Sequence, residues 1–217
     1  MTNRPLHVGV IPDGLRRWAK ANNTTLREAY LRGAKKVVEM LVALQGNGVQ
    51  TVTVYNLSKA NLGRTGAELE AVYSASIAFF TSMIPDAFDP ARCGFRLHGD
   101  LAALPPHYVA PGRHLETTMT GTDFQINILA AYDAYDEIGN AARRAERDGC
   151  DIADALEIGE VDLVIRTTAE PLLSGFCPLQ SQYAQLVFLP TPLNDLNTEE
   201  LDGVLAEYRR SPKPRGL

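Results

Sequence analysis

The sequence predicts an α/β fold in which helices flank a central, mostly parallel sheet of six strands. Short apolar runs rich in β-branched residues alternate with longer segments of helical period, which is typical of parallel sheets covered by helices. At 217 residues and 45% hydrophobic content, the chain is near the upper size of one domain, so a single domain over residues 1–217 is expected. The strands are expected at residues 6–11, 51–57, 95–99, 124–132, 162–167 and 184–189.

Several of the segments between these apolar runs have the periodicity of helices. The chain is expected to enter a helix directly after the first strand, near Asp13. Residues 25–48 then place apolar side chains on one side of a long helix that stops at Gly46 and Gly48. Residues 66–88 and 134–149 predict two further helices. Residues 197–210 predict a last helix, with Thr198 as its cap and acidic residues in its first turn.

Composition excludes several classes of protein. A formal net charge of -5 argues against a general nucleic-acid binder, which needs a basic face. The three cysteines lack metal-ligand spacing and are expected to be reduced thiols in a cytoplasmic protein. The four histidines show no paired metal spacing, so structural or surface roles are expected. No signal peptide or membrane-spanning run is recognised, so stable membrane insertion is not expected.

Charged and polar residues follow three of the expected strands. They are Asp13, Gly14, Arg16 and Arg17 after the first; Ser58, Asn61 and Arg64 after the second; and Arg166, Thr167, Thr168, Glu170 and Ser174 after the fifth. Ligands of open α/β sheets bind outside the carboxyl ends of the strands, so these groups are expected to converge. Guanidinium groups and helix N-termini suit phosphate oxygens, and an aspartate beside them suits Mg²⁺. The pattern therefore predicts a magnesium diphosphate site.

Each of these residues also has an ordinary structural interpretation. Asp13 alone would more often be a helix N-cap, and Arg17 and Arg64 would more often be solvated surface groups. Arg166 alone could be a buried partner of Glu170 or of Asp162. Their shared position at three strand ends favours the ligand interpretation. The motifs of P-loop, dinucleotide-binding and nucleophile-elbow proteins are absent from the sequence.

Five stretches of the chain resemble the motifs of the cis-prenyltransferase family, which has the undecaprenyl diphosphate synthase fold. They are, in collinear order, PDGLRRWA (12–19), YNLSKANLGRT (55–65), LHGDLAALP (97–105), INILAAYDAYDEI (126–138) and DLVIRTTAEPLLSGF (162–176). The resemblance covers nearly the whole chain. It implies the fold of that family, Mg²⁺-dependent transfer of prenyl groups between small prenyl diphosphates, and a homodimer.

The resemblance also implies roles for individual residues. Asp13 would hold Mg²⁺ on the diphosphate of the donor, whose oxygens would bind the Gly14 amide, Arg17 and Arg64. Ser58 and Asn61 would align the group that removes a proton, with a diphosphate oxygen as the candidate base. Arg166 and Ser174 fall in the last of the five motifs and are expected to bind diphosphate, and Arg16 is expected to bind the diphosphate of the second substrate.

The chain departs from the family's pattern mainly on the acceptor side. The departures are Leu15 for asparagine, Arg16 for glycine, Leu62 for tryptophan, Leu172 for an arginine that holds the acceptor's diphosphate, and Gln185 for a glutamate associated with magnesium and the acceptor. The donor site thus looks retained and the acceptor site rebuilt. The stretches PDGLRRW, CPL after Phe176, and PLNDL at 192–196 resemble the lavandulyl-type branch of the family, which makes irregular, head-to-middle products.

The resemblance therefore implies an irregular prenyl diphosphate synthase. It would join two dimethylallyl diphosphates into a lavandulyl diphosphate or, after cyclisation, a cyclolavandulyl diphosphate. Two alternatives stay open: a regular short-chain cis-prenyltransferase that uses isopentenyl diphosphate, and a non-catalytic partner subunit. The latter typically lacks the aspartate that is present here as Asp13. The choice between a dimethylallyl and a geranyl donor and the identity of the base are also left open.

Two further segments carry an interpretation from the family. Val72, Ser76, Phe79, Phe80 and Met83 recur at helical spacing, and in this family such a helix lines the product tunnel. An ordinary core helix is the simpler interpretation of this stripe. In relatives a C-terminal tail bearing arginine reaches the partner's site, whereas residues 213–217 fit that pattern only approximately. A frayed terminus is expected instead.

Overall fold

The computed structural model describes residues 6–211, and its centre is one six-stranded parallel sheet with the order β3-β4-β2-β1-β5-β6. The strands are β1 (His7–Ile11), β2 (Thr51–Ser58), β3 (Cys93–His98), β4 (Phe124–Tyr132), β5 (Leu163–Arg166) and β6 (Gln185–Phe188). β1 and β5 are buried at every position and β4 at all positions but Gln125, which explains their largely apolar sequences. The predicted α/β fold and its six strands are confirmed.

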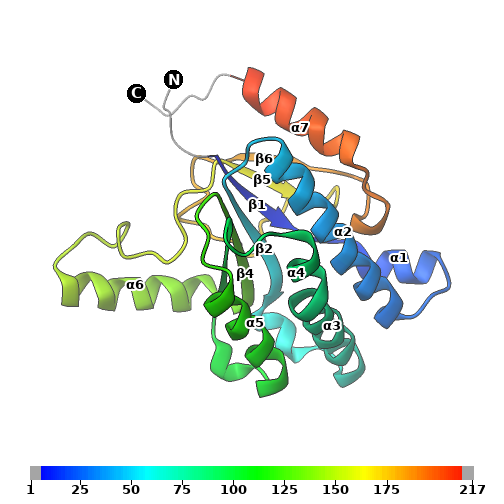
Figure 1. Ribbon diagram of the computed structural model, residues 1–217, viewed down its shortest axis with the longest axis horizontal. Helices are drawn as coiled ribbons and strands as arrows, with labels where there is room; N and C mark the ends of the chain where they lie inside the picture. The colour runs from blue at the N-terminus through cyan, green and yellow to red at the C-terminus, as the bar shows by residue number, and fades with distance from the viewer. Residues whose placement is uncertain (1–5, 212–217) are drawn as a thin grey trace.

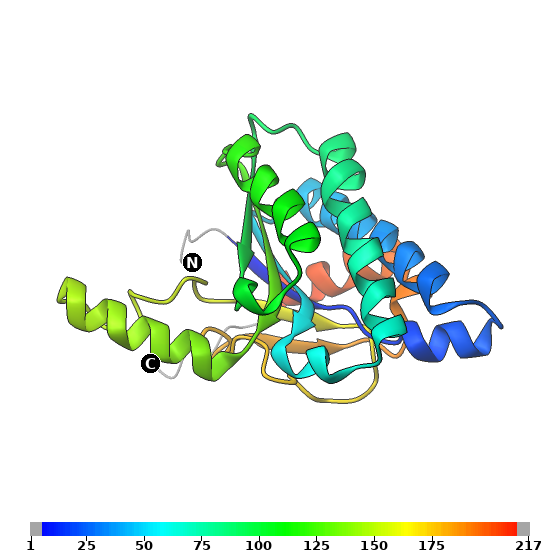
Figure 2. The same cartoon turned by 90° about the horizontal axis from the view of Figure 1, so that it is seen from below.

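Helices and an irregular segment cover the two faces of this sheet (Figures 1 and 2). On one face lie α2 (Leu26–Gly46), α3 (Gly66–Ala78), α4 (Ile84–Ala87) and α5 (Pro106–Thr118), which enclose the larger apolar core. On the other face residues 149–184 help to enclose a smaller core around Phe176 and Cys177. The short helix α1 (Leu15–Ala21) follows β1 directly, as predicted, and α6 (Ala134–Asp148) projects away from the body of the molecule (Figure 2).

The ends of two long helices show how local chemistry fixes the boundaries. Thr25 caps α2 in a reciprocal capping box with Glu28. The helix therefore starts where the Thr25 side chain accepts a hydrogen bond from the backbone amide of Glu28, which has no partner within the helix. The helix α7 (Thr198–Arg210) is capped by Asn197, whose side chain accepts a hydrogen bond from the Glu200 amide. The prediction that Thr198 is the cap is therefore wrong by one residue, because Asn197 has the extended backbone of a cap and Thr198 is already helical.

Two features of the helical face were not predicted. Helix α5 contains Pro106 in its first turn and Pro111 in its interior, and the prolines conceal its helical pattern in the sequence. The predicted helix over residues 66–88 is interrupted by a π-helical segment, Phe79–Met83, between α3 and α4. Such segments are often found at functional sites. The π-helical segment borders the pocket described below.

The remaining predictions on composition concern thiols, histidines and the membrane. Cys93, Cys150 and Cys177 are free cysteines, as predicted. His7 is buried and its Nε2 lies 2.8 Å from Thr53 Oγ1, which confirms a structural role for this histidine. Across residues 6–211, no helix is both long enough and apolar enough to cross a bilayer. The tail considered above, residues 213–217, lies outside the described residues.

Candidate active site

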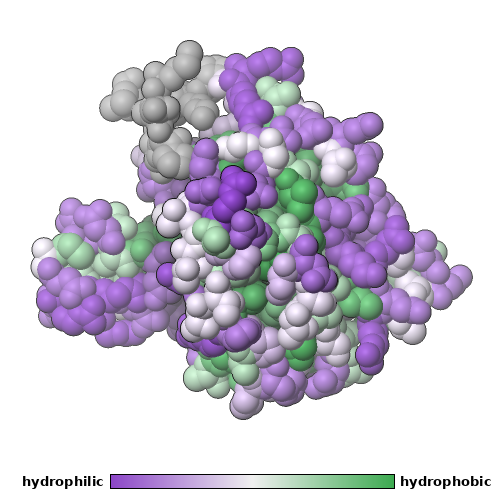
Figure 3. Space-filling model, in the orientation of Figure 1, coloured by the Kyte–Doolittle hydropathy of each residue, from purple (hydrophilic) through white to green (hydrophobic). Residues whose placement is uncertain are grey.

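A pocket of about 670 Å³ opens at the carboxyl ends of β1, β2 and β5. It is lined by ten of the twelve residues that the sequence placed after these strands: Asp13, Gly14, Arg16, Arg17, Ser58, Asn61, Arg64, Arg166, Glu170 and Ser174. Thr167 and Thr168 are not among the described residues that line it. The ten include all nine residues that the family resemblance assigned to the diphosphates, the metal or the proton transfer. The strand order explains this convergence, because β1 lies between β2 and β5 and all three run parallel. The surface view shows apolar side chains exposed between the helices of one face, with hydrophilic residues over α1 and α7 (Figure 3).

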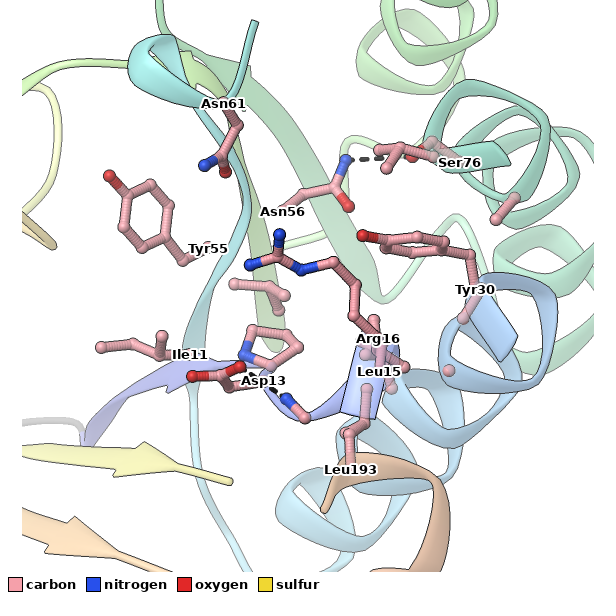
Figure 4. Close-up of a pocket in the computed structure, with 18 of the residues that line it drawn as sticks. Ile11, Asp13, Leu15, Arg16, Tyr30, Tyr55, Asn56, Asn61, Ser76 and Leu193 are labelled. Atoms are coloured by element: carbon pink, nitrogen blue, oxygen red, sulfur yellow. Dashed lines mark hydrogen bonds between the residues drawn. The ribbon is translucent and has the colours of Figure 1, made fainter. Parts of the chain in front are cut away.

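Asp13 lies at the mouth of the pocket, just after β1. Its amide donates a hydrogen bond of 2.8 Å to Thr167 Oγ1, and that hydroxyl donates in turn to the Asp13 carbonyl oxygen at 3.0 Å, so β5 fixes its backbone. Its carboxylate accepts from the Gly14 amide at 2.5 Å and from Arg166 Nη2 at 2.9 Å. The cap of α1 is Gly14, with φ 90°, so the interpretation of Asp13 as an N-cap is wrong. Its carboxylate faces the pocket instead (Figure 4).

Arg166 is the most buried cation of the site, with 8% of its side chain exposed. Its guanidinium pairs with Asp13 and donates to Ser174 Oγ at 2.9 Å and to the Leu172 carbonyl oxygen. The suggested pairings of Arg166 with Glu170 or Asp162 are therefore wrong. Leu172 itself is 55% exposed and is not among the described residues that line the pocket.

Arg17 lies on the same side of the pocket and is more exposed. Its guanidinium donates to Thr168 Oγ1 at 2.8 Å and to Glu170 Oε1 at 3.2 Å, and it lies 3.7 Å from Asp13 Oδ1. More than half of its side chain is exposed, so both pairs are weak and readily exchanged for contacts with a ligand. Asp13, Arg17, Arg166 and Ser174 together form what we call the β5-side cluster.

A second group of charges lies across the pocket, against α2 and α3. The buried carboxylate of Glu68 lies 3.2 Å from Arg64 Nη1 and 3.7 Å from Arg16 Nε, and it accepts from the Tyr30 hydroxyl at 3.0 Å. Burial raises the pKa of Tyr30 to about 12, so its hydroxyl stays protonated near neutral pH and remains a hydrogen-bond donor. Arg16, Arg64, Glu68 and Tyr30 form the α3-side cluster; the first and the last are shown in Figure 4.

Ser58 and Asn61 are joined by two hydrogen bonds at the end of β2. Ser58 Oγ accepts from the Asn61 amide at 3.1 Å, and Asn61 Oδ1 accepts from the Ser58 amide at 3.2 Å, which makes a capping box for the 3₁₀ turn Lys59–Gly63. The Asn61 Nδ2 group has no hydrogen-bond acceptor among residues 6–211 and can donate to a ligand. Tyr55, beside them, has its pKa raised to about 12 by burial.

The interior of the pocket is apolar. It is lined by Val37, Val54, Val72, Phe79, Phe80 and Ile128, from α2, β2, α3, the π-helical segment and β4. Of the predicted stripe of residues 72, 76, 79, 80 and 83, the first four border this space and Met83 is not among its described lining residues. Val72, Phe79 and Phe80 also belong to the main core. A charged mouth above an apolar chamber suits a molecule with an anionic head and a hydrocarbon tail.

The mouth of the pocket fits a magnesium ion that is shared between Asp13 and a bound diphosphate. Residues 6–211 contain no group of three or more His, Cys, Asp or Glu side chains that could hold a metal ion. Asp13 nevertheless offers a carboxylate that is 31% exposed beside the predicted diphosphate-binding groups. Mg²⁺ is commonly bound by one or two carboxylates together with substrate phosphates, so Asp13 fits such an ion when a diphosphate supplies the other oxygens.

Comparison with known proteins identifies the family. The sequence model of the family described as "Putative undecaprenyl diphosphate synthase" matches residues 11–216. The chain belongs to this family. It is 33% identical over 210 residues to (2Z,6E)-farnesyl diphosphate synthase of Mycolicibacterium smegmatis, covering 85% of this chain and 77% of that protein. It is 28% identical over 226 residues to the isoprenyl transferase of Streptococcus agalactiae, covering 95% and 90%. The protein is therefore a prenyltransferase.

The fold of this prenyltransferase matches solved structures closely. Lavandulyl diphosphate synthase from Lavandula x intermedia, in complex with dimethylallyl diphosphate, superposes with a TM-score of 0.88 at 24% identity, covering 96% of this chain and 97% of that one. A probable undecaprenyl diphosphate synthase from Campylobacter jejuni gives a TM-score of 0.84 at 21% identity, with both chains covered completely. At these identities the likeness shows the fold alone. The expected family and fold are confirmed.

Sequence reasoning missed several residues that line the pocket of the prenyltransferase. Tyr30, which lines the pocket, and Glu68, which contacts the lining residues Arg16 and Arg64, were not singled out, because they lie inside helices rather than at strand ends. The i, i+4 spacing of Arg64 and Glu68 was the available signal. Gln185, singled out as a departure from the family, opens β6 and is not among the described residues that line this pocket.

Proposed function

We propose that this prenyltransferase is an irregular prenyl diphosphate synthase that condenses two molecules of dimethylallyl diphosphate head to middle. The observation that carries the proposal is the presence of two separate cationic clusters around one apolar pocket. The β5-side cluster has Arg17 and Arg166, and the α3-side cluster has Arg16 and Arg64. Each cluster can hold one diphosphate, and the shared chamber brings the two prenyl groups together.

The β5-side cluster is assigned to the donor. The guanidinium of Arg17 binds the oxygens of the leaving diphosphate, and the Gly14 amide does so when the diphosphate replaces its contact with Asp13 Oδ1. Arg64 belongs to the α3-side cluster but also reaches the donor diphosphate from the opposite side of the mouth. Arg166 and Ser174 extend the same surface toward the loop after β5. Asp13 would hold Mg²⁺ together with diphosphate oxygens, and the bound ion would supply positive charge to the leaving group. These fixed charges stabilise the departing anion as the C1–O bond breaks.

The α3-side cluster is assigned to the acceptor. Arg16, which stands where the family has glycine, binds the second diphosphate and orients the alkene above the donor. The C2 atom of the acceptor attacks C1 of the donor, which forms the new C–C bond and leaves a tertiary cation at C3. That cation loses a proton to an oxygen of the released diphosphate, which the Asn61 Nδ2 group and the Ser58 hydroxyl align. The products are one ten-carbon prenyl diphosphate, one diphosphate and one proton.

Two finer features belong to the same proposal. The chain resembles cyclolavandulyl diphosphate synthase in its PDGLRRW, CPL and PLNDL stretches, so the product is expected to be cyclised through reprotonation of its alkene. The enzyme is also proposed to act as a homodimer. Size-exclusion chromatography with light scattering tests the dimer, and a mass near 23.7 kDa would contradict it.

A regular short-chain cis-prenyltransferase is the second candidate. It is favoured by the 33% identity to a farnesyl diphosphate synthase, which is a regular enzyme by its name. In that case the α3-side cluster would bind isopentenyl diphosphate, and products would grow only when that substrate is supplied. Leu15, Leu172 and Gln185 count against this candidate, because the family's pattern has asparagine, an arginine that holds the acceptor's diphosphate, and glutamate at these positions.

One incubation separates these candidates. The protein and Mg²⁺ are supplied with dimethylallyl diphosphate alone, and the dephosphorylated products are analysed by gas chromatography and mass spectrometry. A branched or cyclic ten-carbon alcohol supports the proposal. A linear cis product that forms only when isopentenyl diphosphate is added supports the regular enzyme. Absence of diphosphate release with every substrate pair would indicate a non-catalytic subunit. The Asp13→Asn variant is the control, because it keeps the shape of the side chain and removes the charge.

A further inference from the structure

Three polar side chains from three different elements meet beside the apolar interior of the pocket. Asn56 of β2 donates through Nδ2 to Ser76 Oγ of α3 at 3.0 Å and to Tyr108 Oη of α5 at 2.8 Å. Ser76 is 5% exposed and Tyr108 is fully buried, while Asn56 remains partly accessible from the pocket that it lines with Ser76. A polar trio in this position is unexpected, because the neighbouring walls are Val54, Val72 and two phenylalanines.

An irregularity of β2 accompanies this position of Asn56. The register of β2 against β4 runs from Tyr55↔Leu129 to Leu57↔Ala130, and it shifts again before Ser58↔Tyr132. Asn56 therefore has no registered partner in β4, and bulges of this kind redirect side chains near functional sites. Asn56 also lies two residues before the last residue of β2, which places it about 7 Å inside the rim.

The hydrogen bonds fix the orientation of the Asn56 amide. Because Nδ2 uses its two hydrogens for Ser76 and Tyr108, the carbonyl oxygen Oδ1 is the part of the side chain that is left over. Figure 4 shows this oxygen turned away from Ser76, toward the side of the pocket from which Tyr30 and Arg16 project. No hydrogen-bond donor for Asn56 Oδ1 is found among residues 6–211, so water can satisfy it in the free enzyme.

We propose that the Asn56 oxygen is a specificity-determining group that limits the hydrocarbon of the bound donor diphosphate to one five-carbon unit. A five-carbon group can stay between the rim and Asn56. A ten-carbon group must extend past the oxygen and displace its water, and hydrocarbon offers no hydrogen bond in return. The inference rests on the proposed function, since it takes the prenyl groups to enter this pocket. It predicts that the donor is dimethylallyl diphosphate rather than geranyl diphosphate, a choice that the sequence left open.

The test compares two unreactive ligands on variants of constant volume. The ligands are the thiolodiphosphate analogues of dimethylallyl and geranyl diphosphate, with binding measured by calorimetry in the presence of Mg²⁺. Asn56→Leu keeps the shape of the side chain and removes the oxygen. Asn56→Asp keeps both the shape and an acceptor oxygen, because the hydroxyls of Ser76 and Tyr108 can rotate to donate to it. If Asn56→Leu does not fold, Asn56→Ala removes the oxygen without adding bulk and is measured in its place.

Wild type and Asn56→Asp are expected to prefer the five-carbon analogue, and Asn56→Leu is expected to shift the ratio of affinities toward the ten-carbon analogue by roughly tenfold. An unchanged ratio in Asn56→Leu would overturn the inference while leaving the proposed function intact. An equal shift in Asn56→Asp would also overturn it, because the acceptor oxygen would then not be the cause. A wild type that binds neither analogue would overturn the proposed function and this inference with it.

Discussion

Replacing Glu68 with glutamine tests how the α3-side cluster is built. The change keeps the shape of a buried side chain and removes the negative charge that Arg16 and Arg64 share. A hydrogen bond to a charged group contributes about 1.5–3 kcal/mol to the free energy of unfolding. Arg64 is 23% exposed and Arg16 is 63% exposed, so solvent screening reduces that contribution. We expect Glu68→Gln to lower the free energy of unfolding by about 1–2 kcal/mol.

The assay is thermal unfolding followed by circular dichroism. For a chain of this size, about 1 kcal/mol shifts the melting temperature by roughly 2–4 °C, so a decrease of about 2–8 °C is expected. Glu70→Gln is the matched control, because Glu70 is on the same helix and exposed, and its variant should melt like the wild type. The kcat/KM of Glu68→Gln with dimethylallyl diphosphate should also fall, roughly tenfold, because both guanidiniums lose a fixed position. Equal melting temperatures for the two variants would refute the reasoning.

Two further predictions concern the backbone of the site and the dependence of stability on pH. Gly14→Ala should lower the free energy of unfolding by about 1–3 kcal/mol in urea titrations, since φ is 90° and the new Cβ would lie 2.9 Å from Pro192 Cβ. Gly63→Ala, where a Cβ meets nothing within 4 Å, is the control, and an equal loss there would contradict the argument. The hydrogen bond from His98, together with Arg144, lowers the pKa of Glu157. Its contribution to stability is therefore present above the ordinary pKa of 4.5 and is lost as pH falls through the lower folded value. The difference in urea midpoint between wild type and Glu157→Gln should thus shrink as pH falls below 4.5, and a difference that is constant with pH would count against this pairing.

The fold was largely predictable because parallel strands and amphipathic helices leave local patterns. Strands buried on both faces are largely apolar, as β1 and β5 are, and short apolar runs located all six strands, including the edge strand β6, which is only partly buried. The misses have local causes as well. Prolines concealed α5, and the choice between Asn197 and Thr198 as a cap depends on a backbone angle that the sequence does not show. The π-helical segment after α3 has no sequence pattern of its own.

The sequence by itself determined which side chains stand at the ends of β1, β2 and β5, and the family motifs indicated which of them could bind a diphosphate. The order of the parallel strands then brings the nine residues with assigned roles together in one pocket, because residues that end neighbouring parallel strands share one rim of the sheet. The partners of the charged side chains of Asp13 and Arg166 were decided only by the tertiary structure. Arg166 pairs with Asp13 across 153 positions of the chain rather than with Glu170 or Asp162. The contacts of Glu68 with Tyr30 and of Asn56 with Tyr108 likewise join distant segments. Such pairings depend on distances of a few ångströms between elements, which periodicity and spacing along the chain do not encode.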